Sequence, residues 1–255
     1  MAAKEEESEV TLELEIEQLL EDGIRRQGQL EGAGREKGYH ISGLSYDCQR
    51  NIQYSQMEEQ EETRNLEPPD EEFDDGTYRM WIGTMLHITP LTPKHEWGVY
   101  KVFEVNGKKV RVHGHIDEVH VRADGSEVVV DKKFVASVPR VANEHHKRQV
   151  SYYAGLLSET GAKVNTGAIL YFAPVVNRFE GKERIRVFSF PIDTKAALAE
   201  MEQKVRTIQE AIDSGAALPR NPHWLCLFCK FRKPCIEKDG PITVRAYGKT
   251  QTLTE

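Results

Sequence analysis

Residues 113–153 read HGHIDEVHVRADGSEVVVDKKFVASVPRVANEHHKRQVSYY and carry the clearest structural pattern of the chain. Valines recur on both sides of an Ala-Asp-Gly turn at residues 123–125, which predicts two antiparallel strands joined by a tight turn. Asp117 lies on the first strand and Asp131 on the second. Since side chains alternate along a strand, Asp131 and Lys133 project to one face, where Asp117 can join them.

Two carboxylates and a lysine in this arrangement suit the hydrolysis of a phosphodiester bond. Mg²⁺ or Mn²⁺ prefers oxygen ligands and keeps several of its waters, so a few carboxylates and a substrate phosphate make a sufficient site. The metal lowers the pKa of a bound water, and a nearby lysine orients the nucleophile or offsets developing charge. An Asp-x-Lys pattern also arises by chance on solvated strands, so the two strands alone do not establish this chemistry.

A helix is expected directly after these strands. Asn143 is a favourable N-cap, and helical periodicity runs through residues 144–160 until a glycine ends it. His146, Gln149 and Tyr153 are spaced i, i+3 and i+7, which places them along one face of that helix. A buried tyrosine with ordinary polar neighbours has the same pattern, but the order of helix and strands makes chance a weaker explanation.

In this order the motifs resemble the RecB-like branch of the PD-(D/E)xK nuclease superfamily, whose motifs are GxxD, (D/E)xK and QxxxY. The matching segments are GHID at 114–117, DKK at 131–133 and QVSYY at 149–153. GTMLH at 83–87 resembles the helix that contributes a metal-binding histidine in that branch. The resemblance implies an α/β, restriction-endonuclease-like core in which helices flank a central mixed sheet.

The resemblance also implies roles for single residues. The catalytic set would be Asp117, Asp131, Lys133, Gln149 and Tyr153. The Mn²⁺ or Mg²⁺ ligands would be His87, Asp117, Asp131 and the backbone carbonyl of Lys132. Lys133 would act on the nucleophilic water or the phosphate, while Gln149 and Tyr153 would position Lys133 or the DNA backbone.

Four cysteines give a second signal: Cys48 alone, and Cys226, Cys229 and Cys235 in CLFCKFRKPC. In a chain without a secretory signal, clustered cysteines are more often metal ligands than disulfides. Four thiolates fit a tetrahedral zinc or an iron-sulfur cluster, and spacing alone does not choose between them. One cysteine before the nuclease motifs and C-x2-C-x5-C after them resembles the iron-sulfur subgroup of RecB-like nucleases. That resemblance implies a 4Fe–4S cluster joining an N-terminal helix to the C-terminal region.

The same subgroup includes the CRISPR-associated RecB-like exonucleases, which this chain resembles in size and layout. The resemblance implies cleavage of single-stranded DNA or overhangs, commonly from the 5′ end and in some members also internally, during CRISPR spacer acquisition. CRISPR integrase proteins are then expected partners, and a homo-oligomer is left open. Gln49, where relatives commonly have proline, and the acidic segment 58–75 keep a stand-alone or mobile-element nuclease as an alternative. A non-catalytic iron-sulfur DNA-binding subunit and a zinc-ribbon RNA-processing enzyme are further alternatives.

The net charge of -7 is unevenly distributed. Residues 1–22 carry nine acids and one base, and residues 58–75 carry ten acids and one base, so the rest of the chain carries about ten positive charges. A basic body is compatible with binding a polyanion. The expected DNA contacts are Arg140, His146, Lys147, Arg148, Lys230, Arg232 and Lys233. Surface solubility explains these charges nearly as well.

Composition and periodicity divide the rest of the chain. No apolar run approaches the roughly 20 residues that span a bilayer, and the acidic start is unlike a signal peptide, so a cytoplasmic protein without membrane contact is expected. The expected parts are an N-terminal helical extension (1–40), a cluster-binding region (41–60 and 215–240), a nuclease core (76–214) and a C-terminal tail (241–255).

Further elements are expected as helices at 10–30, 39–57 (with Cys48 inside) and 196–211, and strands at 97–105, 168–174 and 184–190.

Overall fold

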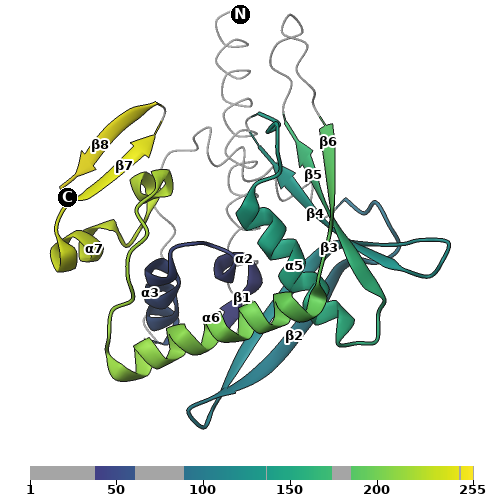
Figure 1. Cartoon of the computed structure of the whole chain (residues 1–255), viewed down its shortest axis with the longest axis horizontal. Coiled ribbons are helices and arrows are strands. Elements are labelled where there is room, and N and C mark those ends of the chain that lie inside the picture. Colours follow the sequence, from purple (N-terminus) through teal and green to yellow (C-terminus); the bar gives the residue numbers. More distant parts are fainter. Residues whose placement is uncertain (1–37, 61–88, 136, 174–184, 247, 255) are drawn as a thin grey trace, which may run out of the picture.

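A computed structural model describes residues 38–60, 89–135, 137–173, 185–246 and 248–254. Its centre is a six-stranded mixed sheet with the order β1-β3-β4-β5-β6, in which β2 pairs with β3 (Figure 1). The strands are β1 (Tyr39–His40), β2 (His95–Val105), β3 (Lys108–Val121), β4 (Glu127–Phe134), β5 (Val164–Phe172) and β6 (Ile185–Pro191). The expected α/β fold with a central mixed sheet flanked by helices is confirmed.

Two tight turns build the antiparallel part of the sheet, as the sequence predicts. Asn106 and Gly107 have positive φ angles of 52° and 73°, and they close the two-residue loop between β2 and β3. Between β3 and β4, the carboxylate of Asp124 accepts hydrogen bonds from the backbone and hydroxyl of Ser126 at 2.9 and 2.7 Å. These turns fix the register of the strands that carry the candidate site.

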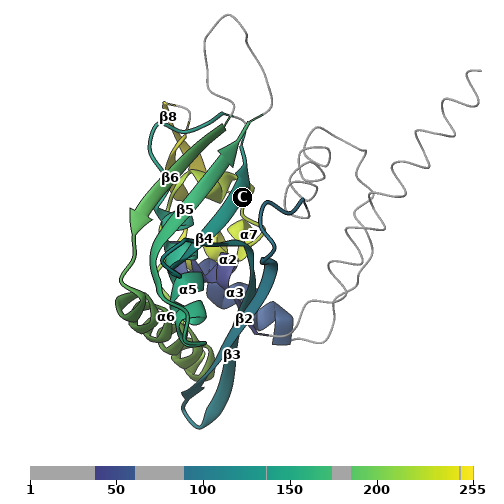
Figure 2. The same ribbon diagram turned by 90° about the vertical axis from the view of Figure 1, so that its right-hand side faces the viewer.

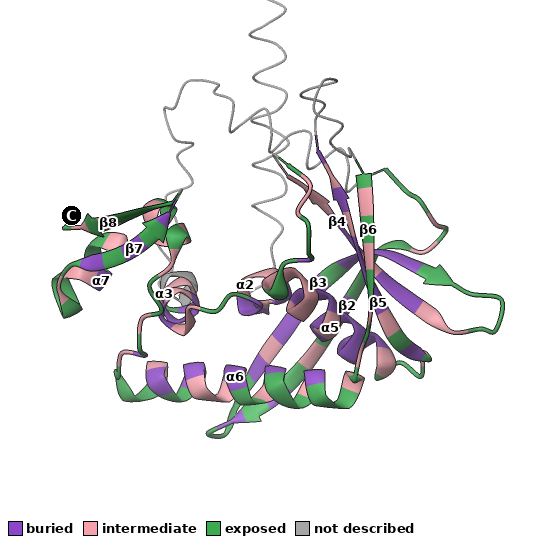
Figure 3. Cartoon of the chain, turned by 45° about the horizontal axis from the view of Figure 1, so that its top comes forward, coloured by how far each residue is buried: buried purple, intermediate pink, exposed green. Residues whose placement is uncertain are grey.

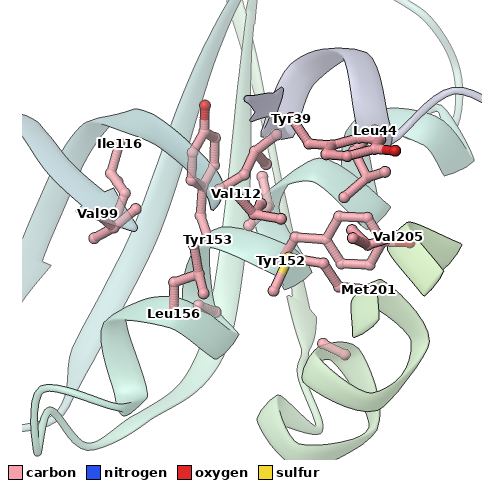
Figure 4. Packing of buried hydrophobic residues seen from close by; sticks show 14 of the residues in the cluster. Tyr39, Leu44, Val99, Val112, Ile116, Tyr152, Tyr153, Leu156, Met201 and Val205 are labelled. Atoms are coloured by element: carbon pink, nitrogen blue, oxygen red, sulfur yellow. The ribbon is translucent and has the colours of Figure 1, made fainter. Parts of the chain in front are cut away.

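Two helices cover the sheet. Helix α5 (Glu144–Ser158) connects the parallel strands β4 and β5, and α6 (Thr194–Ser214) packs across α5. The side chains of Asn143 and Asp193 cap the two helices by accepting backbone hydrogen bonds. Buried residues of α5, α6 and the sheet form one apolar core (Figure 4). Figure 3 shows buried positions recurring along α6, as expected for an amphipathic helix.

Residues 39–57 are not one helix, contrary to the expectation. Helix α2 (Ile41–Leu44) ends at Ser45, whose hydroxyl donates to the carbonyl oxygen of Ser42 at 2.7 Å and so competes with helix propagation. Helix α3 (Gln49–Gln60) then begins directly after Cys48. Cys48 therefore precedes the helix instead of lying inside it.

The C-terminal region contains more structure than the sequence predicts. A 3-10 helix η1 (Trp224–Phe228) and helix α7 (Arg232–Asp239) precede a hairpin of β7 (Ile242–Ala246) and β8 (Lys249–Leu253). The hairpin occupies most of the expected tail, and its buried side chains form a second small core around Cys235. Figure 1 shows α2, α3 and α6 between this unit and the central sheet, and in Figure 2, which is viewed from the sheet's side, the unit lies behind the sheet.

Some expectations fall on residues that the structure does not describe. They concern the helix at 10–30, the acidic segment 61–75 and the helix that would present His87. None of the described helices is long and apolar enough to cross a membrane.

Candidate active site and cysteine pocket

Asp117 and Asp131 face the same side of the sheet. Strands β3 and β4 are antiparallel with Glu118 opposite Val130, and extending this register by one residue sets Asp117 opposite Asp131. Directly opposed residues of an antiparallel pair project to one face. Both carboxylates are buried, and that of Asp117 accepts the backbone N–H of Lys132 at 2.6 Å.

Lys133 completes this group. Its Nζ atom lies 2.8 Å from Oδ1 of Asp131. Burial alone would lower the pKa of Lys133, but the charges of Asp131 and Asp117 raise it above its ordinary value. The lysine is therefore a cation beside two carboxylates, which suits it to binding a phosphate or offsetting negative charge.

Lys132 points to the opposite face, as alternation predicts. Its Nζ atom lies 2.9 Å from Glu118 Oε1 and 2.9 Å from the carbonyl oxygen of Thr89, and both charged side chains are fully buried. Glu118 also accepts the backbone N–H groups of Leu91 and Thr92, at 2.8 and 2.9 Å. The Glu118–Lys132 pair therefore holds residues 89–92 in place. In the sequence, these residues directly follow the segment that contains His87. Glu118 is not among the residues predicted from the sequence, where its signal is a charge on an apolar strand.

Helix α5 presents Gln149 and Tyr153 to the carboxylates. Both side chains are buried, and a hydrogen bond joins them. Burial raises the pKa of Tyr153, and the charges of Asp131 and Asp117 raise it further, so its hydroxyl stays protonated. Figure 4 shows the ring of Tyr153 directed from α5 toward the sheet. The structure therefore brings five residues with expected catalytic roles onto one face: Asp117, Asp131, Lys133, Gln149 and Tyr153.

Gly114 gives the ring of Tyr153 its space, so Gly114→Ala should destabilise the fold by about 1–3 kcal/mol and displace Tyr153. A Cβ atom at Gly114 would lie 2.9 Å from a ring carbon and 3.0 Å from the hydroxyl of Tyr153. Urea unfolding measures the stability loss. Gly43→Ala is the matched control, because a methyl group there meets nothing within 4 Å. Equal unfolding midpoints for the two variants would contradict the packing.

His146 turns inward instead of toward solvent. Its Nδ1 atom lies 2.7 Å from the hydroxyl of Tyr171, a residue on β5. Burial, with the neighbouring charges of His145 and Lys133, lowers the pKa of His146 to about 3. His146 is therefore neutral at physiological pH and brings no positive charge to a phosphate.

The basic residues expected at the DNA differ in their surroundings. Arg148 donates to Ser45 O at 2.9 Å and forms ion pairs with Asp47 and Glu200, so acids compensate its charge. Lys147 pairs with Glu144 within α5. In the C-terminal region, Lys230 lies over the ring of Phe231, and Arg232 donates to Leu227 O. The exposed cations of the set are Arg140, Lys230 and Lys233.

All four cysteines line one pocket. Cys48 comes from the turn before α3, Cys226 lies in η1, Cys229 directly follows η1, and Cys235 lies in α7. None forms a disulfide. Burial raises the pKa of Cys226, and the charges of the other three cysteines raise it further, which reflects how close the sulfur atoms are.

Two side chains of α3 donate to the sulfur atoms. Asn51 Nδ2 lies 3.3 Å from Cys229 Sγ, and Arg50 Nη1 lies 3.6 Å from Cys235 Sγ. Arg50 also pairs with Asp239 at 2.5 Å, so α3 is tied to α7 through protein contacts as well. A set of four sulfur donors with N–H groups aimed at them suits a thiolate-ligated metal or cluster.

The described side chains form no group that could hold a metal ion. Among them, no group of three or more His, Cys, Asp and Glu is arranged closely enough to hold an ion. At the carboxylates, the expected third side-chain ligand, His87, lies outside the described residues.

A mixed sheet with two carboxylates and a lysine on adjacent strands, backed by a helix with glutamine and tyrosine, defines a nuclease of the restriction-endonuclease-like class. The chain belongs to the PD-(D/E)XK nuclease superfamily, whose family model matches residues 5–236. Nucleases of this superfamily use divalent metals such as Mg²⁺ or Mn²⁺.

A solved structure titled "Crystal structure of SSO0001" has a similar fold. The TM-score is 0.57 at 18% sequence identity, and the match covers 86% of this chain and 97% of that chain. At this identity the likeness supports the fold alone. Among curated proteins, none matches this chain significantly.

Proposed function

We propose that this chain is a Mn²⁺- or Mg²⁺-dependent deoxyribonuclease that cuts single-stranded DNA or overhangs. The observation that supports it most is the convergence of Asp117, Asp131 and Lys133 on the face covered by α5. His87, Asp117, Asp131 and the Lys132 carbonyl would hold the metal, which supplies a water of lowered pKa and charge for the phosphoryl oxygens.

The chain's own side chains would orient the attacked phosphate and neutralise the charge that develops on it. Lys133, held as a cation by the carboxylates, binds the attacked phosphate and offsets the charge that develops on it. Tyr153 keeps its proton, so its hydroxyl remains able to donate a hydrogen bond. Gln149, hydrogen-bonded to Tyr153, fixes the direction of that hydroxyl.

Labelled oligonucleotides test the activity and its polarity. We expect single strands and single-stranded overhangs to be degraded with Mn²⁺ or Mg²⁺ and to stay intact with EDTA. Release of a short labelled fragment from a 5′-labelled strand, before one from a 3′-labelled strand, would support cleavage from the 5′ end. Preference for RNA or for blunt duplex would contradict the proposal.

The cysteine pocket would hold a 4Fe–4S cluster, with Cys48, Cys226, Cys229 and Cys235 as its ligands. Protein purified without oxygen is expected to be brown, to contain about four iron atoms per chain and to be bleached by dithionite. Cys235→Ser should lose this absorption, while Ser45→Ala, outside the pocket, should keep it. Colourless protein with one zinc per chain would contradict the cluster and favour a structural zinc.

We also propose a role in CRISPR spacer acquisition, in the cytoplasm, where the nuclease would trim DNA fragments before their insertion. The arrangement of cysteines around the nuclease motifs supports this role. Co-purification with a CRISPR integrase, and faster integration of trimmed fragments, would support it. Sedimentation of the purified protein tests whether it forms a homo-oligomer.

A further inference from the structure

An aromatic pair lies at the edge of the candidate active site. Tyr46, between α2 and α3, is stacked on His145 in the first turn of α5, with 5.4 Å between ring centroids and 17° between ring planes. Tyr46 is 38% exposed, whereas Tyr39, Tyr152 and Tyr153 are almost fully buried. The ring of Tyr46 is therefore partly exposed, and it is supported by the ring of His145.

Protein contacts hold the backbone at Tyr46 and the ring of His145. Lys204 Nζ lies 2.5 Å from the carbonyl oxygen of Tyr46, and Arg148 donates to the preceding carbonyl, that of Ser45, at 2.9 Å. His145 Nδ1 lies 2.7 Å from Oδ1 of the helix cap Asn143. Because these contacts restrain the backbone at Tyr46 and the ring of His145, the segment has little conformational entropy left to lose when a nucleobase stacks on it.

A short series of contacts joins the pair to the catalytic strands. Lys133 on β4 is in register with Tyr171 on the parallel strand β5. The Tyr171 hydroxyl lies 2.7 Å from His146, and the ring of His146 lies 4.0 Å from that of His145. The charge of Lys133 also reaches His145, whose pKa is lowered by burial and then by Lys133. Tyr46 is therefore separated from the phosphate-binding lysine by only a few side chains.

We propose that Tyr46 is a stacking platform for one nucleobase of a single-stranded substrate whose phosphate lies at Asp117, Asp131 and Lys133. The proposal rests on the proposed function. Bases of a single strand expose their faces, and an aromatic side chain can stack on any of the four. Duplex bases are already stacked on their neighbours, so the platform would favour single strands and overhangs.

Binding of fluorescein-labelled oligonucleotides tests the platform. The protein is held in EDTA to prevent cleavage, and a series of oligonucleotides carries one abasic site at each position in turn. For the wild type we expect affinity to fall by about 5- to 150-fold at one position, the range expected for one base–aromatic stack. Equal affinity for every abasic oligonucleotide would overturn the proposal.

Variants of Tyr46 test whether its ring causes this loss of affinity. Tyr46→Leu should bind the intact strand about 5- to 150-fold more weakly and lose its sensitivity to the abasic site, whereas Tyr46→Phe should resemble the wild type. Tyr100→Leu is the matched control, because Tyr100 is an exposed tyrosine on β2. If Tyr46→Leu kept the wild-type abasic pattern, the platform would be excluded. Failure of the proposed function appears separately, as absence of metal-dependent cleavage by the wild type.

Discussion

Asp131→Asn is expected to lower the rate of metal-dependent cleavage by about a thousandfold or more. A bound metal supplies several kcal/mol of transition-state stabilisation, and each 1.4 kcal/mol or so corresponds to a factor of ten in rate. Asparagine keeps the shape of the side chain but removes the negative charge that would hold the metal. Asp131 is 1% exposed and contacts Lys133 at 2.8 Å, so the substitution removes charge at the centre of the site.

The same substitution at Asp124 separates this loss from a general effect on the hairpin. Asp124 lies in the turn between β3 and β4, and its carboxylate bonds Ser126. Asp124→Asn should cleave a 5′-labelled single strand at the wild-type rate. Asp131→Asn should lose that activity but keep its affinity for the strand in EDTA. Wild-type cleavage by Asp131→Asn would remove this carboxylate from the mechanism.

The sequence predicts which site residues share one face of the sheet, because this depends on short-range geometry. Alternation along β4 separates Lys132 from Asp131 and Lys133, and the turn at 123–125 brings Asp117 opposite Asp131. Helical spacing likewise predicts that Gln149 and Tyr153 share a face of α5. Each inference needed only the period of an element and the position of a turn.

The unpredicted features depend on contacts between segments far apart in the chain. Nothing near Gly114 in the sequence shows that a ring from residue 153 fills the space beside it. The break at 45–48 follows from a hydroxyl that competes with the helix, and the partner of Glu118 depends on strand register. Strand β8 carries few apolar residues, so the sequence shows no alternating pattern that would predict its pairing with β7.

Glu118→Leu is expected to destabilise the fold by about 3–5 kcal/mol, because it leaves the charge of Lys132 buried without its partner. Burial alone would raise the pKa of Glu118, but hydrogen bonds from Lys132, Leu91 and Thr92 hold it below its ordinary value. This stabilisation is present at neutral pH. It is lost as the pH falls from about 4.3, the ordinary value, through the lower pKa of the folded state.

Urea unfolding at pH 7 and at pH 3–4 measures both effects. Lys101→Met provides the control, because it breaks a partly exposed ion pair with Glu159 and should cost no more than about 1 kcal/mol. The difference in stability between Glu118→Leu and the wild type should shrink at the lower pH, since the wild-type carboxylate is then becoming protonated. A difference that stayed constant with pH would show that the lost stability does not come from the charge.

The double variant Glu118→Leu/Lys132→Met separates the ion pair from the loop contacts. Replacing both charges by apolar side chains removes the buried cation, so stability should recover in large part. It should not recover fully, because the backbone N–H groups of Leu91 and Thr92 lose their acceptor. The residual loss would measure how strongly Glu118 and Lys132 together hold residues 89–92, since the variant also removes the hydrogen bond from Lys132 to the Thr89 carbonyl oxygen. Full recovery would show that this anchoring contributes nothing, and no recovery would show that the buried charge is not the main cost.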